Sequence, residues 1–383
     1  MSRFILNPFF IIVLFYLISC LLYILPFSNI YPEITVVNIG PVLFFIILNV
    51  LLSILWLYFG FSSININPSE NHQGEFISFM DSVSFITLLL AIFELLYYGV
   101  PLFGMIDYTE FGFPLLHVIL VSGIIISSIF NGLLISRVKS KFYLTVFIIV
   151  SALILNRFLM LLVMMSFIFS YLLINEVKIK RILVALFLSI ALLIAFGEFG
   201  LYRTMLIYNI SYDTAVEYIL GAGYASDAFR DTNLPVSVFW IWLYITSPMS
   251  NLIYNIDVVH SQDIINVWSF FIYDILPQTI SKRIGISPIN VNLIVDNLNV
   301  STAISHVYNS LGYLGILIYT LAYSSVIFVF TFIFKSFRRY VFVIFCSMLC
   351  VFVIFNNVFT MPIFPFSIFI LLIGLFKYGR KPS

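Results

Sequence analysis

The chain has 383 residues, of which 62% are hydrophobic and only 9% are charged. A water-soluble domain usually carries about 25% charged residues, so this composition excludes a soluble globule and indicates helices that face lipid. The formal net charge of +1 also argues against nucleic acid as a partner.

Long apolar runs separated by short polar segments predict about ten membrane-spanning helices, because a bilayer core needs roughly 20 apolar residues per helix. The first run follows Arg3 and has no small-residue cleavage signal after it, so we expect a retained helix rather than a signal peptide. The fold class predicted is an all-α, polytopic transmembrane helical bundle. The runs lie at residues 6–26, 41–62, 83–104, 115–135, 142–155, 158–175, 182–198, 311–334, 340–357 and 361–376.

The apolar stretch at residues 142–175 is long enough for one tilted helix or for two short ones. Basic clusters flank it on both sides, so the chain should return to its starting side, which favours two passes with a turn at Asn156 and Arg157. Arg157 would then lie near membrane depth, where a guanidinium needs a partner. That partner is either an anionic ligand or an internal carboxylate such as Glu94 or Glu198.

Lysines and arginines gather in alternate loops, and the positive-inside rule then places both termini in the cytoplasm. The predicted division is an N-terminal transmembrane bundle of about seven helices at 1–198, a large periplasmic loop at 199–310 and about three C-terminal helices at 311–383. A structureless loop of such length would be unusual, so we expect it to be folded and functional.

Two apolar segments stand out inside this large loop. Val236–Ile245 lies between Pro235 and Pro248 and is too short to span a membrane, which favours an interfacial helix. The second segment, Ile264–Leu276, ends before Pro277. Together the two segments are expected to form a lid or floor over a lipid-proximal cavity.

Polar residues on the outer side are the candidates for chemistry. His306 directly precedes a membrane entry, where a histidine either accepts a proton from a hydroxyl or serves as an ordinary hydrogen-bonding residue. Arg203 and Arg230 offer bidentate contacts to phosphate, although solvated roles fit them equally well. The carboxylates show no metal-ligand pattern, so no metal and no other cofactor is expected. The three cysteines read as small buried hydrophobes.

Three segments carry a resemblance to a known family: LILNRFLML at 153–161, WLYITSPMSNL at 242–252 and STAISHVYNSLGYLG at 301–315. With the late, dominant outer loop, they make the chain resemble bacterial O-antigen polymerases, which join oligosaccharide repeat units. The histidine segment is also similar to that of O-antigen ligases.

The resemblance implies a GT-C-like membrane glycosyltransferase at the periplasmic face of the bacterial inner membrane. It would transfer a glycan from undecaprenyl diphosphate onto a new lipid-linked repeat unit. The implied partners are this lipid-linked oligosaccharide, membrane lipid and a chain-length regulator. A flippase or transporter of lipid-linked oligosaccharide, and an O-antigen ligase, remain the alternatives. The implied catalytic residues are His306, Arg203 and Arg230, and the implied substrate-binding residues are Arg157, Tyr308, Trp242 and Arg283.

Overall fold

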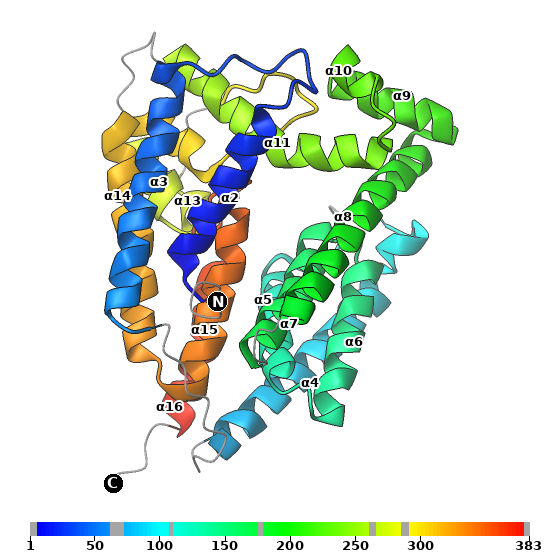
Figure 1. The fold of residues 1–383 in the computed structure, drawn as a ribbon. Coiled ribbons are helices and arrows are strands. Elements are labelled where there is room, and N and C mark those ends of the chain that lie inside the picture. The colour runs from blue at the N-terminus through cyan, green and yellow to red at the C-terminus, as the bar shows by residue number, and fades with distance from the viewer. Residues whose placement is uncertain are drawn as a thin grey trace.

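A computed structural model of the chain describes residues 6–61, 73–106, 110–174, 179–259, 266–284 and 291–378. Within these ranges the fold is helical, and the only β-type pairing is a single bridge between Ser28 and Ala225. The all-α prediction is therefore confirmed for the described part of the chain (Figure 1). The longer helices are α2 (Pro8–Tyr23), α3 (Val36–Tyr58), α4 (Gln73–Tyr98), α5 (Pro114–Leu133), α6 (Val138–Leu153), α7 (Arg157–Ile174), α8 (Ile179–Tyr208), α9 (Tyr212–Ala222), α11 (Val236–Val259), α14 (Ala303–Ile333), α15 (Ser336–Val351) and α16 (Ile363–Tyr378).

Every apolar run predicted as a span coincides with a helix. Among the described residues, six helices are long and apolar enough to cross a membrane, and α2, α7 and α16 contain shorter apolar helices. This supports a polytopic helical membrane protein, while the count of about ten spans stays a prediction. Helices also run across both expected domain boundaries, because α8 continues to Tyr208 and α14 begins at Ala303.

The stretch at 142–175 does fold as two helices, α6 and α7, which pack against each other. The chain reverses at Leu155, whose φ of 56° lies in the left-handed region. The Asn156 side chain then accepts a hydrogen bond from the backbone N–H of Leu159 at 3.0 Å. An asparagine that satisfies a free N–H in this way marks a helix start, so the expected turn at Asn156 is confirmed.

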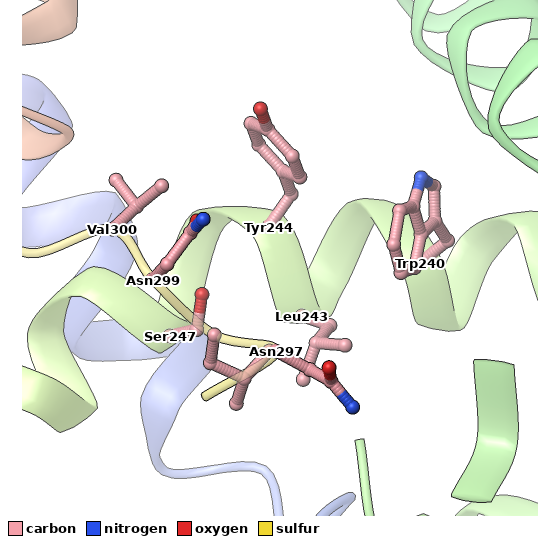
Figure 2. A pocket seen from close by; sticks show the side chains of 8 residues that line it. Trp240, Leu243, Tyr244, Ser247, Asn297, Asn299 and Val300 are labelled. Atoms are coloured by element: carbon pink, nitrogen blue, oxygen red, sulfur yellow. The ribbon is translucent and has the colours of Figure 1, made fainter. Parts of the chain in front are cut away.

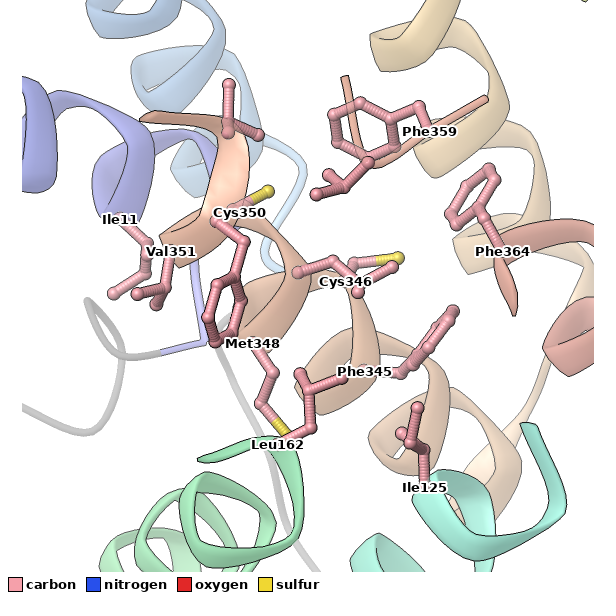
Figure 3. Close-up of a cluster of buried hydrophobic side chains, with 14 of the residues drawn as sticks. Ile11, Ile125, Leu162, Phe345, Cys346, Met348, Cys350, Val351, Phe359 and Phe364 are labelled. Atoms are coloured by element: carbon pink, nitrogen blue, oxygen red, sulfur yellow. The ribbon is translucent and has the colours of Figure 1, made fainter. Parts of the chain in front are cut away.

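Helix α15 lies at the centre of the main core, in contact with α2, α5, α7, α14 and α16. Figure 3 shows its Phe345, Cys346 and Met348 among side chains from these neighbours. Cys346 and Cys350 are fully buried there, as expected of small apolar residues.

Helix α11 is longer than the sequence indicated. We expected an apolar piece ending near Ile245, but the helix continues through Pro248 to Val259 and by length and composition alone could span a membrane. The prediction of a piece too short to span was therefore wrong. Pro248 lacks an N–H, which removes one helix hydrogen bond without ending the helix. Figure 1 nevertheless shows α11 running across the end of the bundle, transverse to α2 and α3.

A smaller cap lies at the same end of the molecule, where α9 and the short α10 (Asp227–Arg230) pack against α8 and the first half of α11 (Figure 1). The segment after α2 is tied to this cap, since Ser28 Oγ donates to the Gly223 carbonyl at 2.7 Å. Asn29 also donates its backbone N–H to the Tyr224 carbonyl at 3.0 Å. The region after α8 is thus a folded element rather than an open loop.

Candidate functional site

The site is built on a buried histidine–aspartate pair that the fold brings together from two segments. His306 Nδ1 lies 2.9 Å from Asp274 Oδ1 and 2.8 Å from Oδ2. The Asp274 side chain is only 3% exposed, and that of His306 is 18% exposed. The sequence singled out His306 but missed Asp274, whose one signal was a lone carboxylate in the apolar string FFIYDIL.

Asp274 is held by a turn of π-helix, η2 (Phe271–Ile275), which follows the short α12 (Val267–Phe270). Turns of π-helix are rare in proteins, and those that do occur are often found at functional sites. The Asp274 carbonyl accepts a hydrogen bond from Asn357 Nδ2 at 3.0 Å, and Tyr319 donates its hydroxyl to Asn357 Oδ1 at 3.0 Å. The backbone under the carboxylate is therefore fixed by Asn357, in the connection between η3 (Phe352–Ile354) and α16, and Asn357 is held in turn by Tyr319 of α14.

His306 lies in the first part of α14, which is set off from the rest of that helix at Gly312. Gly312 has φ of 58° and ψ of −141°, values that glycine adopts freely and other residues rarely do. The Asn266 N–H also donates to the Ser310 carbonyl at 3.0 Å, which joins α12 to the histidine segment. This kinked helix orients His306 toward η2.

Electrostatics set the roles of the two groups. Burial raises the pKa of Asp274 above its ordinary value, and the hydrogen bond with His306 acts in the opposite direction. An ionised carboxylate only accepts hydrogen bonds, so the proton of the neutral imidazole belongs on Nδ1. Nε2 then keeps its lone pair, and within the described residues it is buried without a hydrogen-bond partner.

This arrangement is suited to general acid–base chemistry. A carboxylate that holds one imidazole nitrogen fixes the tautomer and the ring orientation, and it stabilises the imidazolium that forms when the other nitrogen takes a proton. In the described ranges no group of His, Cys, Asp and Glu is arranged to hold a metal ion. The nitrogen that has no hydrogen-bond partner among the described residues, and so could accept a proton, is Nε2 of His306.

A buried asparagine clamp fixes the segment at 291–300 against α11. Asn251 Nδ2 donates to the carbonyls of Leu298 at 2.6 Å and Val300 at 2.8 Å. Asn255 donates to the Asn292 carbonyl at 2.7 Å. Asn309, one turn after His306, donates to Asn255 Oδ1 at 2.9 Å. The clamp thus links α11, the 291–300 segment and the histidine helix.

An open pocket lies between α11 and this clamped segment. Figure 2 shows Trp240, Tyr244 and Ser247 of α11 beside Asn297 and Asn299 of the segment. The sequence alone gave no indication of the two asparagines.

Two of the predicted substrate-binding residues are buried. Tyr308, two positions after His306, is 7% exposed, and its ring contacts that of Tyr313 at 5.9 Å between centroids. Trp242 is 3% exposed and donates its indole N–H to the Leu22 carbonyl at 2.8 Å. The Trp242 ring packs in the cap and does not line the pocket.

The predicted arginines are separated by the fold. Arg230 is exposed on α10 and forms a loose ion pair with Glu217, with 3.5 Å between Nη1 and Oε2. Arg283 is also exposed, but it follows α13 (Gln278–Ser281), which packs against η2. Arg157 and Arg203 lie on α7 and α8, and their side chains are outside the part that the structure describes. Of the arginines with described side chains, Arg283 is thus on the segment next to Asp274.

Glu94 pairs with a histidine of the neighbouring helix α5. Its Oε2 lies 2.8 Å from His117 Nδ1, and the Glu94 side chain is 1% exposed. The other carboxylate suggested for Arg157, Glu198, is exposed on α8. The side chain of Arg157 lies outside the described part of the chain, so its expected pairing with a carboxylate stays a prediction.

Comparison with known proteins adds no relative to these observations: no family model, no curated protein and no solved structure matches the chain. What points to a function is therefore the geometry of the His306–Asp274 pair and the resemblance of the three local segments.

Proposed function

We propose that this protein is a membrane-embedded glycosyltransferase that polymerises polyprenyl-diphosphate-linked oligosaccharide repeat units, as an O-antigen polymerase does. The observation that carries the proposal is the buried His306–Asp274 pair, whose Nε2 is without a partner among the described side chains. His306 lies in the segment at 301–315, which resembles the polymerases and ligases. The inner membrane, its periplasmic face and the GT-C-like type belong to the same proposal.

The reaction follows from the tautomer of His306. Nε2 takes the proton from the attacking hydroxyl of the acceptor sugar as its oxygen bonds to the anomeric carbon of the donor glycan. The bond between that carbon and the diphosphate oxygen breaks, and the polyprenyl diphosphate leaves with the electron pair. Asp274 stabilises the imidazolium that has formed. The proton is afterwards released to water or to the departing diphosphate.

The departing diphosphate needs positive charge, and the segment after η2 supplies it. Lys282 and Arg283 are adjacent, exposed and carried on the piece of chain that packs beside Asp274. Arginine is well suited because its planar guanidinium contacts two phosphate oxygens at once. Arg230 is less suited, since Glu217 already lies beside its guanidinium.

We expect Arg283→Ala to lower the polymerisation rate by about ten- to a hundredfold, because it removes a cation aimed at developing charge. Arg230→Ala is the matched control, and its effect is expected to stay within about twofold because an exposed ion pair contributes little. The measurement is chain extension by membranes supplied with lipid-linked repeat units. A larger loss in Arg230→Ala than in Arg283→Ala would contradict this assignment.

Deleting the gene tests the function as a whole. We expect lipopolysaccharide that carries a single repeat unit and no ladder of longer chains, with the ladder restored by the intact gene. Core without any repeat unit would instead indicate a flippase or a ligase, because both act before or at attachment of the first unit.

The buried Glu94–His117 pair is the one observation that favours a transporter. Ionisable residues inside spanning helices often mark proton or substrate paths. Accumulation of lipid-linked units on the cytoplasmic face after deletion would support that reading, whereas accumulation on the periplasmic face supports the polymerase.

A further inference from the structure

We propose that the pocket between α11 and the 291–300 segment is a binding subsite for an uncharged sugar of the glycan. This inference rests on the proposed function, because it places a saccharide beside the candidate base. It goes further by identifying where the sugar binds and by which side chains.

The chemistry of the lining fits a neutral saccharide. Trp240 and Tyr244 offer aromatic faces, which pack against the C–H face of a sugar ring. Asn297 and Asn299 are exposed and each offers an amide with both donors and an acceptor, which match hydroxyl groups. Of the described residues that line the pocket, none is a carboxylate, a lysine or an arginine. These side chains therefore offer no counter-charge to an acidic or cationic group, which favours an uncharged ring.

The pocket is preorganised. Trp240 is packed against Gly200 of α8, where a Cβ atom would collide with the indole Nε1. On the opposite wall, Asn251 holds the carbonyls on either side of Asn299. Both walls are therefore fixed by buried contacts, so little conformational freedom is lost when a ligand binds.

The pocket also lies close to His306 along the chain. Val300 lines it, and the first turn of α14 leads from there to His306. Three extended residues and three helical ones separate their Cα atoms by at most roughly 15 Å. That span suits a short oligosaccharide with one ring in the pocket and the reacting hydroxyl at Nε2. The hydrogen bond from Asn309 to Asn255 also ties the histidine helix to α11, the helix that forms one wall of the pocket.

The test is direct binding to the purified full chain in detergent. The probe is the oligosaccharide released by mild acid from the source strain's own lipopolysaccharide, labelled with fluorescein at its reducing end and followed by fluorescence polarisation. We expect Trp240→Ala to weaken binding at least tenfold and Trp240→Phe to restore most of it. Trp268→Ala is the matched control, since Trp268 is 73% exposed and lies outside the pocket. Asn299→Ala is expected to weaken binding about fivefold, the loss of one or two neutral hydrogen bonds.

Equal affinity in Trp240→Ala and Trp268→Ala would overturn the subsite, as would the absence of saturable binding to the unmodified protein. Thermal unfolding of each variant checks that a loss of affinity is not a loss of fold, and Asn299→Ala provides a second, milder probe.

The failure of the subsite is distinguishable from the failure of the proposed function. Single-unit lipopolysaccharide after gene deletion together with unchanged binding in the variants would remove only the subsite. Lost binding in Trp240→Ala with no single-unit phenotype would remove only the polymerase.

Discussion

His306→Ala is expected to abolish the polysaccharide ladder and leave single repeat units on the lipopolysaccharide core. The imidazole provides the only partner for the acceptor proton in the proposed reaction, and general-base catalysis typically contributes about 10²- to 10⁴-fold in rate. The measurement is the ladder on a silver-stained gel, with the protein level of the variant matched to that of the wild type. His306→Gln should be equally inactive, because glutamine fills similar space but accepts no proton near neutral pH.

The matched control is His117→Gln, which changes the other histidine that pairs with a buried carboxylate. The polymerase proposal expects it to retain the ladder, whereas a transporter that uses Glu94 would lose repeat units altogether. A full ladder in both His306 variants would remove the base from the mechanism. The labelled oligosaccharide should still bind to His306→Ala, since that residue does not line the pocket.

Asp274→Asn is expected to lower chain extension by about two to four orders of magnitude. In the comparable serine-protease arrangement, the same change leaves the geometry intact and costs about 10⁴ because the imidazole adopts the wrong tautomer. An amide N–H beside Nδ1 would likewise move the imidazole proton to Nε2 and remove the lone pair that accepts the hydroxyl proton. Extension by membranes at fixed substrate concentration measures the loss, and exposed Asp231→Asn is the control expected to stay at the wild-type rate.

The pH dependence gives a second readout on the same carboxylate. Burial raises the pKa of Asp274, so the ionised form that orients His306 is present above this raised pKa and is lost as pH falls through it. Wild-type activity should therefore decline on mild acidification, at a pH where a solvated aspartate would still be charged. The residual activity of Asp274→Asn should not show this Asp274-dependent step. An identical acid limb in the variant would contradict the role of Asp274.

The helices were predictable from the sequence because lipid imposes a simple rule. In lipid, the backbone N–H and C=O groups of an apolar stretch of about 20 residues have to form hydrogen bonds within the stretch, so it folds as a helix. Short polar breaks in the sequence mark where one such helix ends and the next begins. Even the turn at Asn156 followed from the balance of basic residues on its two sides. The course of α11 through Pro248 did not follow, because tertiary packing supports a helix that the proline alone would disfavour.

The pairings of the site were not predictable from one sequence. Asp274 and His306 are 32 positions apart, and no local period relates a π-turn to a helix start. The contact between Glu94 and His117 gave no signal in the sequence either, because the two residues lie on different helices. Asn297 and Asn299 look like ordinary loop residues in the sequence. Only the fold shows that Asn251 fixes their segment beside Trp240.

The positive φ of Gly312 divides α14 into a short first part, which carries His306, and a long second part that ends at Ile333. A transmembrane rod adjusts its tilt when the bilayer becomes thicker or thinner. In an unbroken helix such a tilt would move the His306 imidazole away from the Asp274 carboxylate. A rotation of the backbone at Gly312 instead leaves the first part of α14 in contact with η2. The break at Gly312 would let the long part of α14 change its tilt while the contact between His306 and Asp274 is kept.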